Sequence, residues 1–424
     1  MQHEYPMLEV EEAVGRFLSH FKPLEPEQIP ILDALDRFLA EEIIAEVDIP
    51  PLANTAMDGY ALRCDDTGGA RPDAPRRLRI VADLAAGYVM DRPIPAGAAV
   101  RIMTGAPVPP GAEAVAPFEE VECAGDEVLV FKRYPHHKNI RAAGEDVQAG
   151  QVILERGAVL RPPEIGMLAA LGRPHVVVHR RPRVAILSTG DEVIEPDAPW
   201  QPGKIRDANG YSNAAQVLKY GGIPLRLGIA RDTVDDLTAR IQAGLERDAD
   251  LFLTSGGVSV GDFDVVKTVL AAEGEISFWR VRMKPGKPLA FGTIRGVPLL
   301  GLPGNPVSAM VSFELFARPA ILTMLGKTKL AKPTLDAILV DEIRRKDNRR
   351  HYVRVTLEER DGKTYARLTG DQGSGILLSM VKADGLAIIP EDVDHLPAGS
   401  PVQVMMLDWA GAMKVRLAAT TSFY

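Results

Sequence analysis

The feature that most constrains the fold is a regular alternation of short apolar runs with amphipathic segments between Arg183 and Leu325. The amphipathic segments 211–220, 234–246, 264–273 and 306–325 have the apolar spacing of helices. Strands that alternate with helices form a mostly parallel sheet covered on both faces, with ligands beyond the carboxyl ends of the strands. The predicted strands are 184–187, 224–229, 251–253, 277–281 and 298–301.

The loop after the third of these strands is rich in glycine and serine. Glycine lacks the side chain that would keep a ligand from the backbone, and amides at the start of a helix bind anions. This predicts a phosphate site, although a tight turn that needs glycine gives the same pattern. The residues singled out are Ser255, Gly256, Gly257 and Ser259, with Gly261 behind them.

Charged residues in the neighbouring loops strengthen the prediction of a ligand site. Each taken alone is also explained as a cap or turn residue, because Asp and Ser commonly bond backbone amides at helix starts. Cations and amides hold phosphate or an oxyanion, whereas carboxylates prefer a hard divalent ion that bridges to phosphate. Their convergence on one edge favours phosphoryl chemistry. The residues are Asp191, Glu192, Asp232, Asp262, Asp264, Lys284 and Lys287, with Pro303 in the loop 302–306.

The first part of the chain predicts a helical scaffold and a small β-rich region. The segments 10–18, 31–47 and 161–171 have helical spacing, whereas short β-like runs follow one another between residues 78 and 131. Four residues in turns and loops there are candidates for a site, although an ordinary turn or solvated loop explains each of them. They are Asp58 before a glycine, Thr104 in a proline-rich loop, Arg141 in a basic segment and Asp146 in an acidic turn.

The last part of the chain changes character after a cationic linker at 326–333. Five β-like runs alternate there with polar turns, which predicts a small β-barrel, with Ser374 in the loop 372–375 as a possible ligand contact. The whole is predicted as a multidomain α/β protein. Its expected domains are an elongated scaffold at 1–50 and 141–181, a β-rich domain at 51–140, the mostly parallel α/β domain at 182–328 and a C-terminal β-barrel at 329–424.

Composition bounds the classes of function. The formal net charge of −8 and the pI near 5.6 argue against a general nucleic-acid surface and leave room for local basic pockets. Cys64 and Cys123 lack the spacing of a metal site or a disulfide framework, which favours a reducing cytoplasm. Because no apolar run approaches membrane-spanning length and the first residues lack a signal core, we expect a soluble, unexported protein without membrane partners.

Several stretches between about residues 50 and 316 occur together in the order typical of one family. They are PPLANTAMDGYALR, RIMTGAPVPPGAEAV, NIRAAGEDV, RVAILSTGDEV, KIRDANGYSNAAQVLKYGG, TSGGVSVGDFDVVK, MKPGKPLAFG and LPGNPVSAMVSFELF. With them the chain resembles the molybdopterin molybdenumtransferases, which are related to the gephyrin E domain and complete molybdenum cofactor synthesis. The C-terminal part matches mainly through its predicted fold and GSGILLSMVKADGLAIIP.

The resemblance implies a reaction and a set of site residues. Adenylylated molybdopterin would bind, molybdate would enter the dithiolene, and a magnesium-dependent hydrolysis of the adenylate would release AMP. Glu192, Asp232 and Asp264 would organise the metal and water, and Lys284 would hold phosphate or stabilise developing charge. Asp58, Thr104, Arg141 and Asp146 match further active-site positions. The family also implies a homodimer with a composite active site.

Two other interpretations stay open at this point. A non-catalytic molybdopterin-binding or scaffold protein is one, because the related gephyrin domain also anchors a partner. The adenylyltransferase that precedes this step is the other, because its fold resembles the α/β domain alone. That adenylyltransferase and cofactor-free molybdoenzymes are also the expected partners for supply and delivery.

Overall fold

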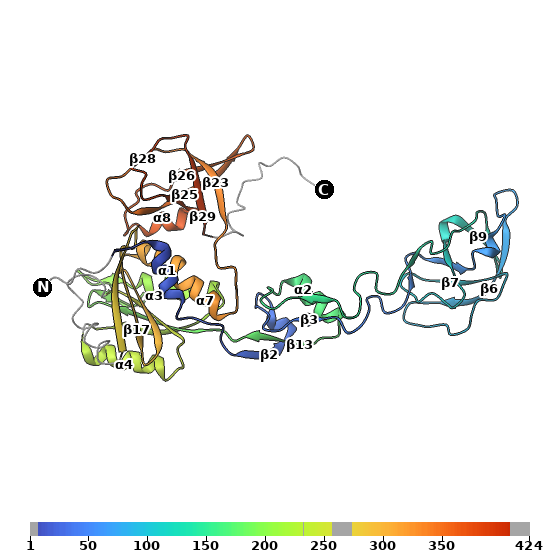
Figure 1. The fold of residues 1–424 in the computed structure, drawn as a ribbon, viewed down its shortest axis with the longest axis horizontal. Coiled ribbons are helices and arrows are strands. Elements are labelled where there is room, and N and C mark those ends of the chain that lie inside the picture. Colours follow the sequence, from blue (N-terminus) through green and yellow to red (C-terminus); the bar gives the residue numbers. More distant parts are fainter. Residues whose placement is uncertain (1–6, 232, 257–273, 408–424) are drawn as a thin grey trace. The chain divides into compact units, whose positions relative to one another are not determined.

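The computed structural model describes residues 7–231, 233–256 and 274–407 (Figure 1). By its internal contacts the chain divides into two compact units. One unit comprises Met1–Ile29, Asp36–Ala40 and Val177–Tyr424, and the other comprises Pro30–Leu35 and Glu41–Val176. The larger unit contains the α/β sheet and the C-terminal barrel, and the smaller unit contains the β-rich sheet.

The larger unit is built on a seven-stranded sheet in the order β1-β19-β21-β22-β18-β14-β17. Four of its six strand pairings are parallel, and only β21 is antiparallel to both of its neighbours. The prediction of a mostly parallel sheet is therefore confirmed. The strands are β1 (Met7–Leu8), β14 (Arg183–Thr189), β17 (Ile223–Ala230), β18 (Leu251–Ser255), β19 (Gly274–Val281), β21 (Pro288–Ile294) and β22 (Val297–Leu302).

Helices cover this sheet where the sequence periodicity predicts them. Leu237 and Ile241 of α4 (Val234–Leu245) pack with Phe252 of β18 in one buried cluster. Burial of each such side chain contributes about 1.5–3 kcal/mol. On α3 (Ala208–Lys219) the Asp207 side chain caps the first turn by accepting the Gly210 N–H at 2.8 Å. The predicted helix 264–273 lies outside the described residues.

The apolar stretch Pro306–Met324 is long enough to span a membrane, but 83% of its most apolar window is buried inside the protein. It consists of α6 (Pro306–Ser312), a π-helical turn, η4 (Phe313–Ala317), and α7 (Arg318–Met324). Phe313 and Phe316 are fully buried. Phe17 of α1 (Val10–Leu18) packs edge-on against Phe316 with ring centroids 6.1 Å apart. This stretch is therefore the central helix of a protein core.

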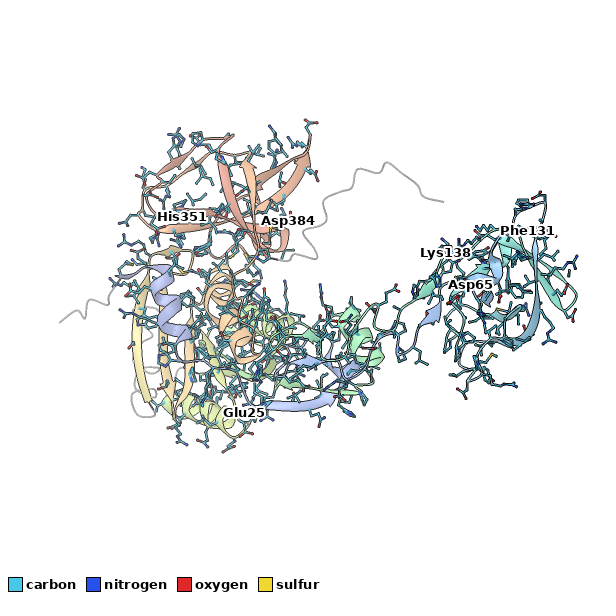
Figure 2. The ribbon with its side chains drawn as sticks, turned by 45° about the vertical axis from the view of Figure 1, so that its right-hand side comes forward. Glu25, Asp65, Phe131, Lys138, His351 and Asp384 are labelled. Atoms are coloured by element: carbon cyan, nitrogen blue, oxygen red, sulfur yellow. The ribbon has the colours of Figure 1, made fainter. Side chains whose placement is uncertain are left out.

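The C-terminal region closes into a five-stranded barrel, as predicted. The strands run in the order β25-β26-β23-β29-β27, and β27 pairs with β25 to close the ring. At the closure Asp384, labelled in Figure 2, accepts the Leu357 N–H at 2.8 Å. Closure removes exposed strand edges and encloses an apolar interior. The strands are β23 (Thr334–Leu339), β25 (Arg350–Arg360), β26 (Lys363–Leu368), β27 (Gly385–Ile389) and β29 (Pro401–Met406).

The smaller unit contains a six-stranded sheet in the order β8-β5-β7-β6-β10-β9 with an apolar cluster on each face. Its strands are β5 (Gly59–Leu62), β6 (Arg76–Leu84), β7 (Ala98–Ile102), β8 (Ala114–Pro117), β9 (Val121–Ala124) and β10 (Glu127–Val130). The smaller unit also contains helix α2 (Pro162–Ala170) and two two-stranded ribbons. The ribbons are β3 (Ile43–Ile44) with β12 (Val152–Leu154), and β4 (Asn54–Thr55) with β11 (Ile140–Arg141).

The helical spacing over 31–47 does not produce the helix that it predicts. The structure has one 3-10 turn, η1 (Ile31–Ala34), and then irregular chain that leads to β3. Asp36 adopts a left-handed backbone with φ of 61°, which ends any right-handed helix. Leu32 is 80% exposed, so the apolar residues at this spacing do not share a buried face. Short elements complete the fold: β2 (Pro26–Pro30) pairs with β13 (His175–His179), β15 (Val193–Ile194) with β16 (Ile205–Arg206), and β24 (Ile343–Arg344) with β28 (His395–Leu396).

Candidate functional site

A cavity of about 760 Å³ lies in the larger unit and is lined by both the α/β part and the barrel. The segment Lys284–Pro288 forms one wall, and the short strand β20 (Met283–Lys284) extends the barrel sheet by pairing with β25. The loop after β22 and the first turns of α6 contribute Pro303, Asn305 and Ser308. Four residues proposed from sequence therefore meet here: Lys284, Lys287, Pro303 and Ser374.

The cavity is strongly basic although the protein is acidic overall. Its lining contains seven lysine and arginine side chains but only two carboxylates, Glu342 and Asp371. Such a local excess of cations concentrates anions at the site. The basic residues are Lys284, Lys287, Arg344, Arg345, Lys346, Arg349 and Arg354.

Lys284 lies beside the carboxylate of Asp347, which also contacts Arg349 and His351. Its register opposite His351, labelled on β25 in Figure 2, brings its Nζ to 3.7 Å from Asp347 Oδ2. Arg349 Nη2 and His351 Nε2 each lie 2.7 Å from an Asp347 oxygen. Burial alone would raise the pKa of Asp347, but the bonds from Arg349 and His351 outweigh it and hold that pKa well below its usual range. Lys284 itself is half exposed and faces the cavity from this cluster.

Arg354 is the most buried of several basic residues of this cavity that the sequence analysis did not single out. It is only 2% exposed, and its guanidinium contacts neutral groups: Nε donates to Ser379 Oγ at 3.0 Å, and Nη2 donates to the Gly373 carbonyl at 3.0 Å. Within the described residues no carboxylate forms an ion pair with it, and Nη1 has no hydrogen-bond partner. Burial lowers the pKa of Arg354, and the charge of Asp371 opposes this shift without forming an ion pair with the guanidinium.

The parallel strands end together at one edge, as predicted. Ser188 of β14 lies opposite Ser255 of β18, which in turn lies opposite Leu302 of β22. The Ser255 hydroxyl is engaged within the fold, because it donates to Ser188 Oγ at 3.4 Å and Ser188 donates to the buried Asp207. Gly256 has φ of +88°, and a Cβ there would lie 2.8 Å from the Thr189 carbonyl oxygen. Both residues thus have structural reasons to be what they are.

Glu192 is the predicted metal ligand that the structure describes. It lies in the exposed loop after β14, with its carboxylate folded toward Gly190, and it has no ion pair or side-chain hydrogen bond among the described residues. An exposed carboxylate without a protein partner suits a hard divalent ion. Asp232, Asp264, Gly257 and Ser259 lie outside the described residues, so the remainder of the predicted metal and phosphate set has no structural description.

The other predicted residues belong to the smaller unit. Asp58 and Thr104 meet directly, because the Thr104 hydroxyl donates to Asp58 Oδ1 at 2.6 Å and the Thr104 N–H donates to the same oxygen at 2.7 Å. These two bonds lower the pKa of Asp58, which is exposed. Arg141 on β11 pairs with Asn54 on β4, and the Asp146 N–H donates to the Ile49 carbonyl at 3.0 Å. Both of their side chains are exposed.

Comparison with known proteins identifies the family. Three family models match successive parts of the chain: the MoeA N-terminal region (domains I and II) over residues 8–172, a probable molybdopterin-binding domain over 185–323, and the MoeA C-terminal region (domain IV) over 336–407. Two crystal structures of a molybdopterin biosynthesis MoeA protein from Pyrococcus horikoshii are similar, with TM-scores of 0.82 and 0.80 at 32% and 31% identity. Each alignment covers 95% of this chain and 100% of that one.

Curated relatives align over nearly their full length. The chain is 36% identical to molybdopterin molybdenumtransferase 2 of Mycobacterium tuberculosis, with 94% of this chain and 99% of the relative covered. It is 35% identical to the molybdopterin molybdenumtransferase of Haemophilus influenzae, with 94% and 98% covered. The chain therefore belongs to the molybdopterin molybdenumtransferase family, a family of transferases in molybdenum cofactor biosynthesis.

Proposed function

We propose that this chain inserts molybdate into adenylylated molybdopterin, with hydrolysis of the adenylate and release of AMP. The observation that carries the proposal is the buried Arg354 guanidinium in a basic cavity, with no carboxylate bound to it within the described residues. A buried cation that has no bonded carboxylate gains a favourable interaction when an anion binds to it. Both reactants are anions, since one is an oxyanion and the other carries phosphates.

The cavity residues suggest a division of roles. Arg354 and Lys287 supply charge and directed N–H donors to an anion, with the Ser308 hydroxyl and the amides around Ser374 beside them. Lys284, held next to Asp347 at the cavity wall, is placed to hold phosphate or to stabilise charge that develops during hydrolysis. The planar guanidinium of Arg354 presents a fixed fork, whereas the lysines contribute mobile point charges.

Magnesium belongs to the same proposal. A bound Mg²⁺ supplies charge neutralisation at the phosphates and a polarised water. Glu192 offers it an exposed carboxylate without a described partner, and we expect Asp232 and Asp264 to complete the ligand set. The chemistry of these three side chains, all hard oxygen donors, fits this ion rather than a softer metal.

The remaining expectations follow from the family resemblance. We propose a homodimer with a composite active site, to which Asp58, Thr104, Arg141 and Asp146 contribute. A molybdopterin adenylyltransferase would supply the substrate, and cofactor-free molybdoenzymes would accept the product. We also propose a cytoplasmic location, which agrees with the unpaired state of both cysteines.

The test is AMP release from adenylylated molybdopterin by the purified protein with magnesium, with and without molybdate. We expect molybdate-dependent release and subsequent activation of a cofactor-free molybdoenzyme. Arg354→Ala should lower this rate at least about 100-fold, as expected for loss of a charged donor in a buried site. Arg360→Ala is the matched control, because Arg360 lies on the same strand but is exposed and pairs with Glu358.

The outcomes separate the proposal from its alternatives. Tight binding of the substrate without AMP release, in a folded sample under both conditions, would show a binding or scaffold protein instead. Consumption of ATP without molybdate would indicate an adenylyltransferase. Equal loss of activity in the two arginine variants would remove the assignment of Arg354 to the site.

A further inference from the structure

The smaller unit brings together three side chains that are typical metal ligands and that the proposed reaction does not use. One ligand atom each from Cys64, Glu113 and His136 lie within 4.8 Å of one another. Across residues 7–231, 233–256 and 274–407, this is the one group of three or more such side chains that are so closely spaced. The sequence gives no sign of it, because the three residues are far apart in the chain.

Backbone hydrogen bonds fix the positions of all three residues. Cys64 follows β5 and Glu113 precedes β8, and these neighbouring strands are joined where the Glu113 N–H donates to the Leu62 carbonyl at 2.9 Å. The loop with His136 is joined to the same place, because the His137 N–H donates to the Glu113 carbonyl at 2.7 Å. In Figure 2 the labels Asp65 and Lys138 mark the turn and the loop from which Cys64 and His136 come.

The Glu113 carboxylate is already oriented. The Cys64 N–H donates to Glu113 Oε2 at 2.9 Å, and the other oxygen lies 3.8 Å from His136 Nδ1. Ligating carboxylates in metal sites are commonly held by such a bond. An ion pair between His136 and Glu113 explains little by itself, because both side chains are substantially exposed and such pairs contribute at most about 1 kcal/mol. Nor does it explain the buried thiol of Cys64 beside them.

We propose that Cys64, Glu113 and His136 form a zinc site that ties the loop 131–139 to the β5–β8 edge of the sheet. Thiolate, imidazole and carboxylate are the three ligand types of protein zinc sites, and a fourth position is filled by water. A thiolate in the set disfavours magnesium and calcium. On binding, the thiol proton passes to solvent, a sulfur lone pair forms the Zn–S bond, and no group is oxidised or reduced.

The three ligand atoms need to approach one another only slightly to bind zinc. Around a tetrahedral zinc ion, a sulfur and a nitrogen ligand lie about 3.5 Å apart. His136 is 60% exposed and Glu113 is 39% exposed, so these two side chains can move toward the buried sulfur while the backbone stays in place. Their exposure also leaves the fourth position open to water.

The site would matter for the geometry of the segment that follows it. The loop 131–139 leads directly into β11, which carries Arg141, and the Asn139 carbonyl accepts the Ala56 N–H at 2.9 Å, two residues before Asp58. His137 and Asn139 both have positive φ, so this loop holds backbone conformations that are uncommon for residues other than glycine. Zinc would hold the same loop at His136, directly before these two residues.

The test uses the full chain, stripped of metal by a chelator and loaded with Co²⁺ as a spectroscopic substitute in a buffer that contains excess Mg²⁺. We expect one tightly bound Co²⁺ per chain, with a thiolate-to-cobalt charge-transfer band and the visible bands of a tetrahedral site, all abolished by Zn²⁺. Cys64→Ser should remove the charge-transfer band, whereas Cys123→Ser, which alters the other cysteine, should retain it.

A second pair of variants keeps the test decisive if Cys64→Ser, a buried substitution, fails to fold. His136→Ala changes an exposed side chain and should weaken Zn²⁺ binding at least tenfold in a competition with a chromophoric chelator. His137→Ala, at the adjacent position, should bind as the unmodified protein does. The proposal is overturned by the absence of a charge-transfer band in the folded protein, by a band that survives in Cys64→Ser, or by equal affinities of the two histidine variants.

Discussion

Two buried cations in the larger unit, Lys332 and Arg354, differ in whether a carboxylate is bonded to them. Lys332, before the barrel, lies 2.6 Å from Glu314 Oε2, and both side chains are almost fully buried. Glu314 accepts further bonds from Gln216 and Tyr220, so both charges of the Lys332–Glu314 pair have partners. Arg354, inside the cavity, contacts a hydroxyl and a carbonyl but no carboxylate in the described part of the chain.

The difference separates a structural charge from a functional one. Taking a charge out of water is unfavourable by several kcal/mol, and a protein recovers this by placing a counter-ion next to it. Burial lowers the pKa of both Lys332 and Arg354, but only Lys332 has an adjacent carboxylate that opposes the shift through a hydrogen bond. Where no carboxylate of the fold is bonded to a buried cation, an anionic ligand can form that interaction. This reasoning assigns Lys332 to stability and Arg354 to binding.

The largest expected effect comes from removing the counter-ion of Lys332. Glu314→Gln leaves a buried ammonium without its carboxylate and should lower the free energy of unfolding by about 3–5 kcal/mol. The double variant Glu314→Gln, Lys332→Met should recover most of that loss, because the ammonium is removed together with its carboxylate. Urea titration followed by circular dichroism measures both. A loss below about 1 kcal/mol in the single variant would show that the pair is not structural and would break the comparison.

Arg354→Met should change the stability of the ligand-free protein little and should abolish its stabilisation by anions. We expect the free energy of unfolding without ligand to change by about 1 kcal/mol or less, because lost hydrogen bonds are offset by the removal of an uncompensated charge. Stabilisation by anions should disappear, however. An anion at 100 times its dissociation constant stabilises the folded protein by about 2.7 kcal/mol. Thermal unfolding with molybdate, and separately with phosphate, should therefore show a rise in Tm in the unmodified protein only.

The control for this prediction is Arg360→Met on the same strand. Arg360 is exposed and pairs with Glu358, so its substitution should leave the anion-dependent rise in Tm intact. A rise of equal size in Arg354→Met would place the anion elsewhere in the cavity.

Most of the fold could be predicted from the sequence because burial leaves a direct pattern. The run Leu251–Ser255 is buried along its whole length, and such strands appear as continuous apolar stretches. Several strands of the sheets were not predicted, and two of them show different reasons for this. Gly59–Leu62 is fully buried but only four residues long beside an Asp-Gly turn. Pro288–Ile294 is joined to the next strand by Arg295 and Gly296, both at positive φ, and arginine gives no sign of such a turn.

The candidate site was less predictable, because its key contacts come from distant segments. Lysines and glycines next to strand ends pointed to the right edge of the sheet, and Lys284 and Lys287 do line the cavity. Nothing in the stretch around Arg354 shows that this arginine is buried, because barrel closure and the bonds that it donates to Ser379 and Gly373 create its environment. The group of Cys64, Glu113 and His136 could not be predicted for the same reason, because its members come from distant segments.

A smaller effect is expected from the neutral partner of Arg354. Ser379→Ala removes the hydroxyl that accepts a hydrogen bond from Arg354 Nε at 3.0 Å. The guanidinium keeps its charge but loses one of the hydrogen bonds that fix its orientation. The affinity for molybdate should fall about five- to tenfold, which corresponds to about 1 kcal/mol for one hydrogen bond. Isothermal titration calorimetry measures it, with Ser400→Ala in another loop of the barrel as the control. If the affinity falls as far as in Arg354→Met, the orientation of the Arg354 guanidinium contributes more to binding than its charge does.

The smallest effect concerns a charge that is exposed and has neutral partners. Asp58 accepts bonds from the Thr104 hydroxyl and N–H, and these bonds lower its pKa because they favour the ionised form. Thr104→Val retains the N–H but removes the hydroxyl, so the pKa of Asp58 should rise toward its ordinary value. A lowered carboxyl pKa stabilises the fold above the ordinary pKa, and this contribution is lost as the pH falls through the lowered value. In Thr104→Val this contribution to stability should be lost at higher pH than in the unmodified protein. A carbon-13 NMR titration of the carboxyl group should likewise show that Asp58 is protonated at higher pH. An unchanged titration would show that the Thr104 hydroxyl contributes little and that the backbone N–H is sufficient to keep the pKa of Asp58 low.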